Sequence, residues 1–122
     1  MKTGFNLKDK LSKLPKKPGV YIYKDSTGKI IYIGKALSLK HRVSSYFNKN
    51  ISDPKTKVLV SNIADIKHIV VSSEFEALLL EAQLIKQHQP KYNIQQKNLE
   101  QQLTGEDYGR LICLIVIYLH QR

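Results

Sequence analysis

The stretch GVYIYKDSTGKIIYIGK, residues 19–35, constrains the fold of this 122-residue chain more than any other segment. Apolar and aromatic residues alternate on both sides of the turn-forming run DSTG, which predicts a β-hairpin. Each arm of the hairpin also places a tyrosine two residues from a glycine, as Gly-Val-Tyr at 19–21 and as Tyr-Ile-Gly at 32–34. The sequence therefore predicts a hairpin that carries tyrosines and glycines on both arms.

The register of this hairpin decides which side chains share a face. If Asp25 pairs with Gly28 across a two-residue loop, Tyr21 lies opposite Tyr32 and Gly19 lies opposite Gly34. We favour this register because it collects the aliphatic side chains on the other face, namely Val20, Ile22, Ile31 and Ile33. The tyrosine face, where two glycines leave the backbone uncovered, is then a candidate site.

Two alternatives to that interpretation stay open. A type I turn with a bulge at Gly28 would shift the register by one residue and send Tyr32 to the opposite face. Even in the favoured register, Tyr21 and Tyr32 could form only a stabilising cross-strand aromatic pair.

Periodicity and capping signals predict the other elements. We expect helices at about residues 5–14, 38–48, 53–66 and 73–89, and a third strand at 68–71 that joins the hairpin. Pro15 and Pro18 end the first helix, and Ser73 and Glu76 form a capping box that opens the last. Residues 91–94 are expected to be extended, and residues 110–121 to form an apolar strand. The fold class is α+β, with a mainly antiparallel sheet of three or slightly more strands flanked by helices.

The charge of the chain predicts a polyanionic partner. Twenty Lys and Arg face ten Asp and Glu, a formal net charge of +10, and 18 of the basic and 7 of the acidic residues precede residue 98. Nucleic acid is the leading candidate, ahead of an anionic membrane, although charge can also serve solubility alone. The single cysteine, Cys113, excludes an internal disulfide, and the longest apolar run, 111–119, is too short to span a bilayer. We expect a cytoplasmic protein that does not enter membranes.

Three side chains after the hairpin suggest a phosphate site. Lys35 follows Gly34 directly, and the next predicted helix carries Arg42 and Tyr46 four residues apart, where they share a stripe. Each alone is an ordinary surface residue. Together with the hairpin tyrosines they form a cationic, hydroxyl-rich group that suits a phosphate.

Glu81 stands out in the last helix because leucine, isoleucine and alanine surround it in the sequence. A partly buried carboxylate needs a cation, which a lysine or arginine or a metal ion could supply. For Glu81 considered alone, a salt bridge is favoured over a metal ion.

Four ordered blocks of the chain resemble the GIY-YIG nuclease domain, in the form found at the N-terminus of excision-repair endonuclease subunits of the UvrC type. They are PGVYIYKD, IIYIGKALSLKHRVSSYF, VVSSEFEALLLEAQLIK and QPKYNI, and they cover most of residues 18–94. The resemblance implies a small sheet flanked by helices and metal-dependent hydrolysis of a DNA phosphodiester with a single Mg²⁺ or Mn²⁺. It also implies a nuclease domain at 1–97 and a C-terminal tail at 98–122, either a last strand or a truncated extension.

The resemblance assigns roles residue by residue. The catalytic residues would be Tyr21, Tyr32, Arg42, Tyr46 and Glu81, with Glu81 also the metal ligand, and the substrate-binding residues would be Lys35, Asn93 and Gly34. Tyr21 is the candidate base, because nearby Arg42, Lys35 and a bound cation would favour the ionised form of a phenol whose ordinary pKa is about 10. Tyr32 and Tyr46 would position water or phosphate, and Arg42 would offset charge on the phosphate.

The partner implied by the resemblance is DNA, nicked during nucleotide excision repair. UvrC proteins continue into a segment that binds a helicase partner, a second nuclease domain and a helix-hairpin-helix region, and this chain has none of that length. Contacts with other repair proteins therefore stay open. Two other functions also stay open: a DNA-binding module that does not cut, and an interaction domain for an acidic protein.

Overall fold

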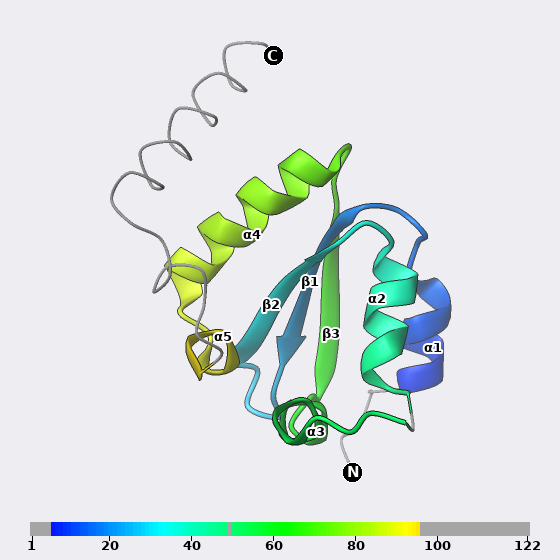
Figure 1. Ribbon diagram of the computed structural model, residues 1–122, viewed down its shortest axis with the longest axis vertical. Helices are drawn as coiled ribbons and strands as arrows, with labels where there is room; N and C mark the ends of the chain where they lie inside the picture. Colours follow the sequence, from blue (N-terminus) through cyan, green and yellow to red (C-terminus); the bar gives the residue numbers. More distant parts are fainter. Residues whose placement is uncertain (1–5, 49, 96–122) are drawn as a thin grey trace.

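The computed structural model describes residues 6–48 and 50–95, which form one three-stranded antiparallel sheet between layers of helices (Figure 1). The elements follow the order α1 (Leu7–Lys13), β1 (Gly19–Lys24), β2 (Ile30–Ala36), α2 (Leu39–Tyr46), α3 (Pro54–Ser61), β3 (Asp65–Val70), α4 (Glu74–His88) and α5 (Lys91–Gln95). The strand order is β2-β1-β3, so the third strand joins the hairpin as predicted. The predicted strand at 110–121 and the tail from 98 lie outside the described residues.

The helices cover both faces of the sheet. In Figure 1, α4 lies on one side of the strands and α1 and α2 lie on the other. On the α4 side, Val20 and Ile33 are fully buried against Ala77, with Leu80 and Leu84 packed around them. On the other side, the buried tyrosines of β1 pack with Leu39 and Val43 of α2. The tyrosine face is therefore part of the core and not an open surface.

The hairpin register differs from both predictions. Tyr21 lies opposite Gly34, Tyr23 opposite Tyr32, and Gly19 opposite Ala36. The turn is the one in the second prediction: Gly28 has a left-handed φ of 86° and donates its N–H to the carbonyl of Asp25 at 3.0 Å. That turn alone would have sent Tyr32 to the other face.

A second irregularity, at Ile31, returns Tyr32 to the face of Tyr21, as the favoured register predicted. Lys24 pairs with Ile30 and Tyr23 with Tyr32, so Ile31 is an extra residue on β2. The two shifts together move the register by two residues, which leaves Tyr21 and Tyr32 on one face. The prediction that Ile31 joins Val20 on the aliphatic face is wrong, because its side chain packs in the cluster that contains the tyrosines.

Two other element predictions need correction. The helix expected to reach residue 66 ends at Ser61, since Asp65 to Val70 pair with β1 instead. The segment expected to be extended forms α5, where the N–H of Asn93 donates to the carbonyl of Pro90 at 3.1 Å. This turn directs Tyr92 and Asn93 into the protein, and both are buried. Within the described residues, no helix combines the length and apolar character that a bilayer crossing requires.

Gly34 tests the packing of the hairpin. A Cβ on this residue would overlap the ring and hydroxyl of Tyr21. Gly34→Ala should therefore lower the free energy of unfolding in urea by about 1–3 kcal/mol. Gly28→Asn is the control, because nothing lies within 4 Å of a Cβ at Gly28 and asparagine tolerates its positive φ. Equal losses in the two variants would contradict this packing.

Candidate active site

Four phenol rings form a compact tyrosine cluster between β1, β2 and α2. Its members are Tyr21, Tyr23, Tyr32 and Tyr46, whose ring centroids lie 5.2 to 6.2 Å apart. The hydroxyls of Tyr21 and Tyr46 are hydrogen-bonded at 2.8 Å. Three of these rings were predicted as site residues, whereas Tyr23 was assigned no role. Its place in the alternation, two residues from Tyr21 on the same strand face, was the signal for it.

Helix α2 brings a guanidinium to this cluster. Ser38 caps the helix and buried Leu39 and Val43 anchor it, so Tyr46 turns inward while Arg42 stays exposed. The Nη2 of Arg42 donates to the hydroxyl of Tyr46 at 3.4 Å, and its Cζ lies 5.1 Å from the centre of that ring. The predicted pairing of Arg42 and Tyr46 is thus present in the structure.

The surroundings of Tyr21 oppose the ionisation that we expected of it. Burial first, and then the neighbouring phenols of Tyr46 and Tyr32, raise the pKa of Tyr21 well above its ordinary value. Burial also raises the pKa of Tyr32, with Tyr46 and Glu81 adding to the rise and Arg42 opposing it. Arg42 and Tyr21 do interact, but burial and the neighbouring phenols outweigh that interaction at Tyr21, and Tyr32 is the less buried phenol of the two.

Glu81 reaches the outer edge of β2 from α4. Its Oε2 accepts a hydrogen bond from the backbone N–H of Lys35 at 2.8 Å. Burial raises the pKa of its carboxyl group, and the Lys35 N–H and charge partly oppose that rise. In the part of the chain that the structure describes, no lysine or arginine forms an ion pair with Glu81 and its Oε1 accepts no hydrogen bond. The salt bridge that we favoured from sequence is therefore not formed there.

Asn93 and Gly34 have structural contacts that the substrate-binding prediction did not foresee. The amide of Asn93 bonds the backbone of Ile33 twice, accepting from its N–H and donating to its carbonyl, both at 2.9 Å. Gly34 is buried beneath Tyr21, so its backbone is not left uncovered as expected. Both residues shape β2 from inside the protein.

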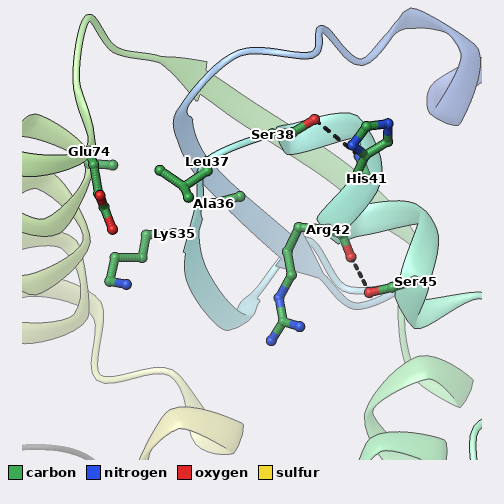
Figure 2. Close-up of a pocket in the computed structure, with 9 residues that line it drawn as sticks. Lys35, Ala36, Leu37, Ser38, His41, Arg42, Ser45 and Glu74 are labelled. Carbon is green, nitrogen blue, oxygen red and sulfur yellow. Dashed lines mark hydrogen bonds between the residues drawn. The ribbon is translucent and has the colours of Figure 1, made fainter.

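A groove of about 500 Å³ lies beside the cluster, between the end of β2, helix α2 and the start of α4 (Figure 2). Lys35 and Arg42 line it together, which confirms that the structure brings these two cations to one place. Leu37, His41, Ser45 and Glu74 also line it, and the sequence analysis gave none of these a role. Leu37, His41 and Ser45 lie four residues apart, the spacing of one helix face, whereas no local pattern links them to Glu74 on α4.

Comparison with known sequences decides the family. The profile of the UvrC-like GIY-YIG domain matches residues 17–94, which are most of the chain. The chain belongs to the UvrC-like GIY-YIG family. This confirms the resemblance found in the four sequence blocks, and the three-stranded antiparallel sheet with flanking helices confirms the α+β class.

Relatives of this GIY-YIG chain are longer proteins. The UvrABC system protein C of Bacteroides fragilis is 56% identical over 94 residues, which are 77% of this chain and 16% of that protein. The protein of the same name from Methanococcus maripaludis is 56% identical over 88 residues, 72% of this chain and 17% of the relative. The chain therefore spans less than a fifth of the length of these relatives.

A solved GIY-YIG structure shows the same fold. The N-terminal endonuclease domain of UvrC from Thermotoga maritima, bound to its catalytic divalent cation, magnesium, is 42% identical with a TM-score of 0.65. The match covers 73% of this chain and 99% of that domain. Variants of that domain with one Tyr→Phe or Asn→Ala substitution are also described as bound to the catalytic cation.

The residues of this GIY-YIG chain fit a single divalent cation. Residues 6–48 and 50–95 contain no group of three or more His, Cys, Asp or Glu side chains placed to hold a metal. Magnesium often binds through one or two carboxylates and takes its remaining ligands from water and substrate phosphate. Glu81, with one oxygen fixed by Lys35 and the other unengaged among these residues, suits that type of site.

The raised tyrosine pKa values predict a loss of stability in alkali. Above pH 10, where free phenols ionise, the unfolded chain releases protons that the folded chain keeps on Tyr21, Tyr23 and Tyr32. The free energy of unfolding should therefore fall as pH rises past about 10. Urea titrations at a series of pH values, followed by phenolate absorbance, measure this change. The free energy of unfolding of Tyr23→Phe should fall less steeply with pH. Ionisation of all three phenols in the folded protein near pH 10 would contradict the account.

Proposed function

We propose that this chain is a metal-dependent DNA endonuclease domain that hydrolyses one phosphodiester bond, as a nick in nucleotide excision repair. The observation that carries the proposal is the meeting of three groups around Tyr32. The ring of Tyr32 lies 6.2 Å from that of Tyr46, whose hydroxyl accepts a hydrogen bond from Arg42. Glu81 accepts the N–H of Lys35 on the strand of Tyr32. The effects on the pKa of Tyr32 agree, since burial, Tyr46 and Glu81 raise it and Arg42 lowers it. Such an arrangement suits a metal, a water and a phosphate.

Glu81 would hold the cation, Mg²⁺ or Mn²⁺, through its Oε1 while Lys35 keeps Oε2 in place. When bound, the cation supplies charge that polarises the scissile phosphate and stabilises the leaving oxygen. The cation-bound Tyr→Phe and Asn→Ala variants of the Thermotoga domain agree with a site that depends on a carboxylate and not on those side chains. Glu81 is therefore our metal ligand, as the family resemblance implied.

Tyr32 replaces Tyr21 as our candidate for the proton acceptor. Tyr21 is 1% exposed and its hydroxyl bonds that of Tyr46, which keeps it away from an attacking water. Tyr32 is less buried and lies nearer the carboxylate charge, whose neutralisation would lower the pKa of the phenol. Tyr21 then orients Tyr46, and Tyr46 with Arg42 binds the phosphate.

Arg42 and Lys35 would grip the DNA backbone, since both line the groove beside the cluster. Arg42 can contact two phosphate oxygens at once, which Lys35 cannot. Asn93 would act indirectly by holding β2. A module that binds DNA without cutting would need only the Glu81 oxygen that accepts the Lys35 N–H and not a second oxygen left for a cation, so we favour the nuclease.

The setting follows from the relatives. We propose that DNA is the substrate, that the domain works in the cytoplasm, and that other proteins of a UvrABC system are its partners. The segments of the relatives outside the matched region would supply the contacts with those proteins.

A nicking assay on supercoiled DNA with Mg²⁺ or Mn²⁺ tests the function. Glu81→Gln should lower the rate about 10³-fold because the cation loses its carboxylate. Tyr32→Phe should lower it about 10²–10⁴-fold, as loss of a proton acceptor does. Glu76→Gln, on the same helix, should stay within about threefold of the unmodified chain.

The proposal has two ways to fail in this assay. A chain that cuts no DNA with any divalent cation is not a nuclease on its own. Glu81→Gln or Tyr32→Phe cutting as fast as Glu76→Gln would show that the assigned residues do not carry the reaction.

A further inference from the structure

The groove beside the tyrosine cluster combines charge with an apolar surface. Lys35 and Arg42 line it, and so does Leu37, which is 65% exposed. In Figure 2, Leu37 lies on the segment between β2 and α2, with Lys35 and Glu74 on one side of it and Arg42 on the other. A site for a phosphate alone would gain nothing from an exposed apolar side chain such as Leu37.

The groove also contains a group that phosphate would avoid. Glu74, the first residue of α4, lines the same space as the two cations. A carboxylate repels a phosphate, but it accepts hydrogen bonds from the amino groups of nucleobases. The lining therefore offers cations for a phosphate, an apolar side chain for the flat face of a base, and an acceptor for a base edge.

Size and charge agree with one nucleotide as the occupant. A volume of about 500 Å³ falls within the range of roughly 300–1,000 Å³ that is common for small-molecule sites. The chain carries a net charge of +10, which favours a nucleic acid over neutral or cationic ligands. Apolar side chains such as leucine separate stacked bases in other DNA-binding proteins.

We propose that this groove takes one nucleotide of the DNA, unstacked from its neighbour, beside the phosphodiester that is cut. Leu37 packs against the base, Lys35 and Arg42 contact the adjoining phosphates, and Glu74 faces the base edge. This inference rests on the proposed nuclease function, and it makes Leu37 a residue that positions the strand.

The test uses DNA duplexes with 2-aminopurine at successive positions, because the fluorescence of this base rises when it unstacks. Binding is measured in EDTA, where metal-dependent cutting does not proceed, and nicking is measured separately with Mg²⁺. The unmodified chain should raise the fluorescence at one position. Leu37→Ala should lose most of that rise and slow nicking about tenfold, while its DNA affinity changes by less than about threefold, since the phosphate contacts remain.

Two variants serve as controls. Val58→Ala removes an apolar side chain of similar exposure, 52%, on α3 outside the groove, and should behave as the unmodified chain does. Leu37→Met keeps an apolar side chain and should retain both the fluorescence rise and the nicking rate. Because Leu37 is largely exposed, its variants should melt like the unmodified chain.

Three results would overturn the inference. The first is Leu37→Ala giving the same fluorescence rise and nicking rate as Val58→Ala. The second is DNA bound by the unmodified chain with no rise at any position. If the unmodified chain also nicks DNA normally in that case, the nuclease function is supported and only the nucleotide site is wrong. The third is a chain that does not bind DNA, which overturns both proposals. A fluorescence rise that depends on Leu37, without nicking by any cation, supports the site and removes the nuclease function.

Discussion

The outer edge of β2 is closed by side chains, and the site depends on that closure. Asn93 bonds the N–H and carbonyl of Ile33, and Glu81 accepts the N–H of Lys35. A strand edge left without partners exposes backbone groups that need hydrogen bonds. The bond from Lys35 fixes Oε2 of Glu81 and leaves Oε1 for the proposed cation. The same contact therefore closes the edge of the sheet and positions the proposed metal ligand.

One short strand thus serves three functions, at positions 32, 34 and 35. Tyr32 faces the tyrosine cluster, Gly34 gives the ring of Tyr21 room to pack, and Lys35 leads into the groove. Because side chains alternate along a strand, Tyr32 and Gly34 share one face and Lys35 points to the other. Helix α2 completes the arrangement from the other side, since buried Tyr46 bonds Tyr21 and exposed Arg42 bonds Tyr46. A shift of β2 would therefore disturb the phenols, the cations and the carboxylate together.

The sequence predicted the elements and the family well, because alternation, capping and prolines are local signals. It placed the two hairpin tyrosines on one face but missed the register. Gly28 and Ile31 each shift the pairing by one residue, and two such shifts return the side chains to the predicted face. It also did not foresee that both faces of the sheet are covered, so that Tyr21 is buried and burial raises its pKa. The bonds of Asn93 to a strand 60 residues away have no local signature.

The central claim is that Glu81 holds the cation, and the stability of the protein in Mg²⁺ tests it most directly. A ligand that binds only the folded state at 100 times its dissociation constant adds about 2.7 kcal/mol to the free energy of unfolding. The melting temperature should therefore rise with the Mg²⁺ concentration in the unmodified chain and in Glu76→Gln. The melting temperature of Glu81→Gln should not change with Mg²⁺. An equal rise in Glu81→Gln would place the cation elsewhere and contradict the account.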